Sequence, residues 1–262
     1  MKLDFYAYLA EYAAVFALVL VRVGFLVAFL PVFGSRLVPP MIKAASILVL
    51  ALILTPLAVG RTKMPATAWE FLLLCVPEAL LGLSMAFLVR LVFAGVQFGG
   101  QLLGFQMGFG VANVIDPATG VEAPVLAQMA YLVALLLFLV FDIHHYFFLA
   151  LGESFKVFPP GTLKGSKEVF HLLVLQGEDI FRLAIRILAP AMAILLLIQI
   201  AMGIVSRFVP QVNVMIISFP LTIGVGLFFF GLTLQVLGRV LEPAYGEAVR
   251  SLPFIMRAFG GH

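Results

Sequence analysis

Residues 95–124 read GVQFGGQLLGFQMGFGVANVIDPATGVEAP, in which regularly spaced glycines lead into a polar, turn-forming segment. Residues four apart lie on the same side of a helix, so glycines at this spacing leave one face without side chains. Another backbone can then approach closely, as it does between packed membrane helices. The sequence therefore predicts a helix with two sets of packing glycines. These are Gly95 and Gly99 in one set, and Gly100, Gly104 and Gly108 in the other.

The end of this stretch indicates an irregular loop. Asp116-Pro117 and Gly120 favour turns, because proline disfavours helical backbone in the residue before it and glycine tolerates turn conformations. Irregular backbone at membrane depth occurs only where protein buries it or water reaches it. We therefore expect the segment after about Gly108 to line a space inside a protein or an assembly.

The composition indicates a membrane protein. Hydrophobic residues make up 63% of the 262 residues, and charged residues only 11%, against roughly 25% in soluble domains. Several apolar runs approach or exceed the length of about 20 residues that a helix needs to cross a bilayer. These features predict an all-α, polytopic membrane protein. The runs are 12–30, 44–59, 71–93, 125–151, 183–205 and 212–237.

Two charged residues lie deep within apolar runs. Arg22 and Glu78 would each cost about 2.5–3.5 kcal/mol at the centre of a membrane helix, so each needs a partner or water. We expect both to be buried charges that pair within the chain or with a neighbouring subunit. A direct pair between the two is one of these alternatives.

The sequence gives no pattern for catalysis. Asp142, His144 and His145 could form a metal site, but adjacent side chains on a helix point about 100° apart, which disfavours chelation of one ion by both histidines. Serines in apolar runs lack a G-x-S-x-G elbow, and no phosphate-binding loop is present. We therefore expect no enzyme activity, no catalytic residue, no cofactor and no metal. The net charge of +3 gives no reason to expect a nucleic-acid partner.

A charged segment, residues 152–182, divides the chain. Its sequence around His171 suggests a short amphipathic helix at a surface. It separates an N-terminal part, residues 1–180, from a C-terminal helical hairpin, residues 181–262. The hairpin tip is apolar, which suggests that partner subunits cover it. The tip residues are Pro210, Gln211, Asn213 and Pro220.

Several stretches resemble one known family. They occur in the family's order and cover nearly the whole chain, and on them the chain resembles the FliR family of flagellar type III export-gate proteins and its injectisome counterpart. The stretches are R-x-G at Arg22 and Gly24, LPVFGSRLVPP at 30–40, PEALLGL at 77–83, GGQLLGFQMGFGVANVIDPATG at 99–120, APVLAQ at 123–128, FDIHHYFFLALGESF at 141–155 and PQVNVMIISFPLTIGVG at 210–226.

The resemblance implies an architecture and a set of partners. Residues 1–180 would be a FliP-like helical part and residues 181–262 a FliQ-like hairpin. The expected partners are FliP-like, FliQ-like and FlhB-like subunits, unfolded secreted proteins and membrane lipid. The expected location is the flagellar basal body in the bacterial inner (cytoplasmic) membrane.

The resemblance also implies a plug, a loop near residues 108–122 that closes the export pore. Gly108, Gly110, Pro117 and Gly120 would shape this loop. The residues carried over to the plug itself are Phe109, Val111, Asn113, Val114, Ile115 and Asp116. Where some family members have a lysine in the hairpin, this chain has Thr222.

Two alternatives remain open. A proton-coupled small-molecule secondary transporter would use Glu78 and Asp142 as coupling carboxylates, but the inverted repeats of such carriers are not evident. In a purely structural scaffold, the helix that carries these glycines would serve for packing alone. Packing and pore lining are compatible roles, and Phe105, Met107 and Phe109 between the glycines could form a seal.

Overall fold

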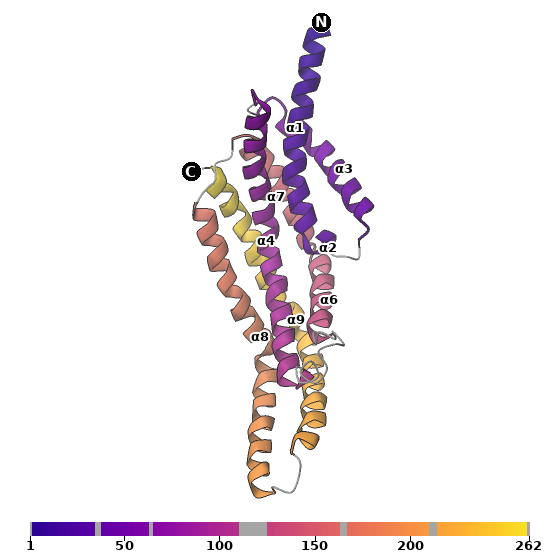
Figure 1. Ribbon diagram of the computed structural model, residues 1–262, viewed down its shortest axis with the longest axis vertical. Coiled ribbons are helices and arrows are strands. Elements are labelled where there is room, and N and C mark those ends of the chain that lie inside the picture. The colour runs from indigo at the N-terminus through magenta and orange to yellow at the C-terminus, as the bar shows by residue number, and fades with distance from the viewer. Residues whose placement is uncertain are drawn as a thin grey trace. The chain divides into compact units, whose positions relative to one another are not determined.

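The computed structural model describes residues 2–34, 38–62, 65–109, 125–162, 167–209 and 214–260. Every regular element in these ranges is a helix, which confirms the all-α prediction (Figure 1). In chain order the elements are α1 (Lys2–Phe29), α2 (Pro31–Gly34), α3 (Pro40–Ala58), α4 (Ala68–Gln106), α6 (Val125–Val140), α7 (Ile143–Val157), α8 (Lys167–Phe208) and α9 (Val214–Gly260).

The helices also confirm the membrane class. Five of those described are long and apolar enough to cross a bilayer, or six if α6 and α7 together form one broken span. Helices α4, α8 and α9 have 39, 42 and 47 residues, about twice the length that a crossing needs. The expected short helix around His171 is therefore wrong. It is the first part of α8, which begins at Lys167 and continues past residue 182, because residues 167–182 contain no proline.

Local signals explain where α3 begins and ends. Pro40 stands at its first position, where proline lacks only an N–H that has no partner inside the helix. Just past its last residue, Gly60 has a φ of 77°, the left-handed conformation in which helices commonly end. Pro56 lies inside the same helix, as prolines often do in membrane helices.

The chain forms two compact units. The first comprises Met1–Leu91, Asp142–Gly177 and Tyr245–His262, and the second comprises Val92–Phe141 and Glu178–Ala244. Long helices contribute one part to each unit. The division into residues 1–180 and 181–262, predicted from the charged segment and interpreted as FliP-like and FliQ-like parts from the family resemblance, stays a prediction.

Each unit has its own packed interior. In the first, α1 packs on α3, and Leu18, Leu26 and Met85 are fully buried. In the second, Phe93 of α4 packs against Tyr131 and Phe138 of α6, with ring centroids 5.3 and 5.8 Å apart. These interiors hold the polar and glycine-rich sites described next.

Candidate functional site

A buried ion pair lies at the centre of the first unit. Arg22 on α1 and Glu78 on α4 have no exposed surface. The Nε of Arg22 donates to Oε2 of Glu78 at 2.7 Å, and Nη2 lies 2.6 Å from the same oxygen. The two charged residues that the sequence places deep in apolar runs thus lie in direct contact.

Further groups form hydrogen bonds with this ion pair. Arg22 also donates from Nη1 to Ser154 Oγ at 2.9 Å and from Nη2 to the Phe158 carbonyl at 3.2 Å. The second carboxylate oxygen of Glu78 accepts from the Gly161 N–H at 3.0 Å. The guanidinium lies 4.3 Å from the ring centroid of Phe155. The network therefore joins α1, α4, α7 and the turn that follows α7.

Glycines make the close approach in this network feasible. A Cβ added at Gly82, one turn after Glu78, would collide with the carbonyl oxygen of Arg22, so α1 and α4 touch there backbone to backbone. Gly161 has a φ of 82°, which favours glycine and suits the turn that presents its N–H to Glu78. Sequence reasoning missed Gly82, Ser154 and Gly161. The four-residue spacing from Glu78 to Gly82 was the available signal for the first.

We predict that removing one charge of the pair destabilises the protein strongly. Glu78→Ala or Arg22→Ala leaves a buried charge without its partner, which typically costs about 3–5 kcal/mol. The double variant Arg22→Met, Glu78→Leu should recover much of this loss, because no charge then remains buried. Thermal unfolding of the chain in detergent measures the change.

The exposed ion pair between Arg182 and Glu178 is the matched control. Their side chains are 70% and 64% exposed, so Glu178→Ala should cost no more than about 1 kcal/mol. Equal losses for Glu78→Ala and Glu178→Ala would contradict a central role for the buried pair.

The packing glycines stand against other helices of the second unit. A Cβ on Gly95 would lie 3.1 Å from Leu183, and one on Gly99 would lie 3.3 Å from Leu188, both on α8. A Cβ on Gly100 would lie 2.5 Å from the Cα of Ala127 on α6. Gly104 is buried on the same helix. Gly95 and Gly99 thus face α8, and Gly100 faces α6.

We predict that Gly100→Leu disrupts this packing. Its Cβ would meet the backbone of α6, which cannot rotate away as a side chain can, so α6 must move. The variant should unfold at a clearly lower temperature in detergent. Gly203→Ala is the control, because a Cβ there meets nothing within 4 Å among the described residues. Alanine should stabilise that helix position by up to about 1 kcal/mol.

A junction between α4 and α9 lies where the glycine helix ends. Met107 is fully buried, and its side chain fills the space beside Gly226, where an added Cβ would lie 2.5 Å from Met107 Cγ. Thr222 Oγ1 donates to the Met107 carbonyl at 3.3 Å. Gly108 follows with a φ of 92° and lies against the ring of Phe219. These contacts hold Met107 and Gly108 against α9.

Much of the predicted plug and tip lies outside the described residues. Phe109 is half-buried directly after the junction, and Pro220 is exposed on α9. The plug residues outside the described ranges are Gly110, Val111, Asn113, Val114, Ile115, Asp116, Pro117 and Gly120. The tip residues outside them are Pro210, Gln211 and Asn213.

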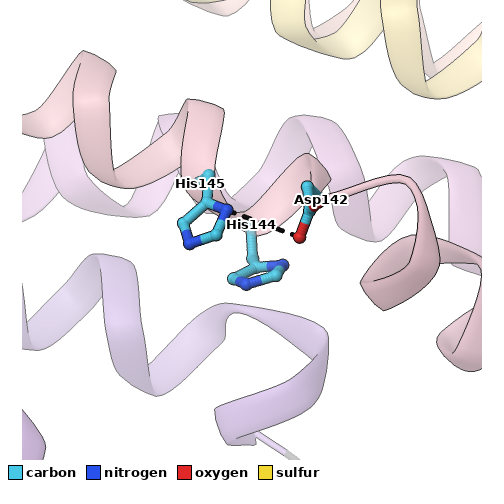
Figure 2. Close-up of side chains that lie close together, drawn as sticks. All are labelled: Asp142, His144 and His145. Atoms are coloured by element: carbon cyan, nitrogen blue, oxygen red, sulfur yellow. Dashed lines mark ion pairs between the residues drawn. The ribbon is translucent and has the colours of Figure 1, made fainter.

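A cluster of polar side chains lies at the start of α7. Asp142, His144 and His145 come together there, with ligand atoms that all lie within 4.8 Å of one another (Figure 2). The spacing argument from the sequence did not anticipate this proximity. Within the described residues these three side chains are the set that could hold a metal ion.

Comparison with known proteins gives one consistent family. The model of a family described as bacterial export proteins, family 1, matches residues 13–248. The flagellar biosynthetic protein FliR of Bacillus subtilis (strain 168) is 30% identical over 251 residues, which cover 94% of this chain and 95% of that protein.

Other relatives carry the same description. The flagellar biosynthetic protein FliR of Escherichia coli (strain K12) is 29% identical over 237 residues, 90% of each chain. That of Aquifex aeolicus (strain VF5) is 28% identical over 250 residues, 90% of this chain and 91% of the relative. The similarity therefore extends over nearly the whole sequence.

Proposed function

This chain belongs to the bacterial export proteins of family 1, and from that premise we propose that it forms part of the protein-conducting pore of the flagellar type III export gate. Its relatives are flagellar biosynthetic proteins, and its helices are those of a membrane protein. In this proposal it resides in the bacterial inner membrane at the flagellar basal body. Unfolded export substrates pass through the pore.

The junction of α4 with α9 is the observation that carries the pore proposal. Met107 and Gly108 are held by Thr222, Gly226 and the ring of Phe219, so the chain enters residues 110–124 from a fixed point. A loop can close a lumen only if the residues at its start keep a fixed position. The loop sequence itself contains bulky apolar residues, which exclude water and ions when they meet in a constriction.

The exposed apolar surface of the helices is an argument that other subunits bind this chain. Only 17% of the α3 span and 22% of the α8 and α9 spans are buried inside this chain. Such surfaces are covered by lipid or by other proteins. We propose that FliP-like, FliQ-like and FlhB-like subunits cover part of them, with residues 1–180 as the FliP-like part and residues 181–262 as the FliQ-like hairpin.

The plug proposal predicts that removal of the loop opens the pore. Deleting residues 110–120 should raise ion conductance across membranes that contain the assembled complex, because the apolar constriction is lost. Conductance in planar bilayers or ion leak in cells measures this. An intact complex with unchanged conductance would rule out the plug.

The junction predicts a second, more local effect. Gly226→Leu should displace Met107, because the leucine side chain would occupy the same space. The segment after Met107 would then shift, and the assembled pore should leak ions. Gly224→Leu is the matched control on the same helix. A Cβ at Gly224 meets nothing within 4 Å among the described residues, so closure should persist. Equal leak from both variants would contradict a positioning role for the junction.

The geometry disfavours the transporter alternative. A coupling carboxylate must exchange protons with water, but Glu78 is fully buried and bonded to Arg22 and to the Gly161 N–H. A carrier would lose transport of its substrate in Glu78→Gln with its fold intact. An export-gate subunit should instead lose stability and assembly in that variant.

A further inference from the structure

Three side chains with metal-binding donors gather at the start of α7 (Figure 2). Asp142 Oδ1 lies 3.4 Å from His145 Nδ1, and the rings of His144 and His145 have centroids 4.3 Å apart at an interplanar angle of 31°. The side chains of His145 and Asp142 are 65% and 66% exposed within this chain. An ion can therefore reach the cluster from outside the packed interior.

The backbone at Asp142 favours the approach of its carboxylate to His145. Asp142 has φ 54° and ψ 25°, the left-handed conformation, and it precedes the first residue of α7. Aspartate adopts this conformation more readily than most residues. At this N-cap position a carboxylate usually bonds to the first backbone N–H groups, but that of Asp142 makes no such bond. It lies beside His145 instead.

Packing on the other side supports the His144 ring. His144 meets the edge of Phe148 at 6.5 Å, and Phe148 packs against Phe33 of α2 at 6.1 Å. Ile143 and Phe147 are buried and anchor the first turn of α7. The first turn is thus fixed by aromatic and aliphatic contacts that do not depend on the polar cluster.

The donor set selects the class of metal. Two imidazoles and one carboxylate suit Zn²⁺ and related transition ions, whereas Mg²⁺ and Ca²⁺ prefer oxygen ligands alone. Zinc bonds of about 2.0–2.1 Å in a tetrahedron place neighbouring donors about 3.4 Å apart. The pair Asp142 and His145 already has that separation. The donor atoms of His144 and of the other two residues lie within 4.8 Å of one another.

We propose that Asp142, His144 and His145 form a binding site for a divalent transition metal of the zinc class, with water at the remaining position. The bound ion links the left-handed residue before α7 to the first turn of that helix. Metal binding therefore stabilises the backbone at this break, since anything that binds only the folded state raises its stability. This site does not depend on the export function proposed above.

Cobalt binding tests the proposal directly. The full chain, purified in detergent without a polyhistidine tag, is titrated with Co²⁺ and the visible absorption of tetrahedral cobalt is followed. We expect one Co²⁺ per chain, displaced by Zn²⁺, and a higher unfolding temperature with Zn²⁺ than without it. Absence of saturable binding would overturn the proposal.

Three variants and one control locate the ion. Asp142→Asn, His144→Gln and His145→Gln should each weaken binding at least tenfold. Asparagine also tolerates the left-handed conformation, so Asp142→Asn should fold normally, and its unfolding temperature without metal verifies this. His171→Gln is the control, because His171 is an exposed histidine on α8 outside the cluster. Equal binding in Asp142→Asn and the unmodified chain, or equal losses in His171→Gln and His145→Gln, would refute the site.

Discussion

The first unit depends on the compensation of two buried charges. An arginine and a glutamate without exposed surface are tolerated only because each polar atom finds a partner. Arg22 donates to Glu78, Ser154 and the Phe158 carbonyl, and Glu78 also accepts from Gly161. These partners come from three helices and a turn. Because an unpaired buried charge would be strongly destabilising, those elements must pack so that these partners stay within hydrogen-bond distance.

Glycine allows helices to approach closely in both units. At Gly82 it brings two backbones into contact beside the ion pair, and at Gly95, Gly99 and Gly100 it lets α4 approach α8 and α6. At Gly226 the missing side chain leaves space for Met107. In membrane helices such close approach supplies much of the packing energy, because lipid and leucine are about equally apolar.

These constraints suit the pore role proposed above. A pore subunit must hold its helices rigidly while one segment remains able to move aside for a substrate. In that proposal the ion-pair network and the glycine contacts hold the helices together, and the contacts of Met107 with Thr222 and Gly226 hold the end of α4. The family shared with flagellar biosynthetic proteins places this arrangement in the context of export.

The sequence alone determined the class of the molecule. Hydropathy and run length indicated membrane helices, the four-residue spacing of glycines indicated packing faces, and the cost of isolated charges singled out Arg22 and Glu78. These are local properties, since each depends on residues within a few turns of one another.

Tertiary structure alone decided which groups meet. Arg22 contacts residues 56 and 132 positions away, and no local pattern specifies such pairs. Asp142, His144 and His145 come together at the left-handed residue before α7 although the two histidines are adjacent on the helix, and their donor atoms lie within 4.8 Å of one another. In each case long-range packing, rather than local preference, selects the backbone conformation and the contacts that the side chains make.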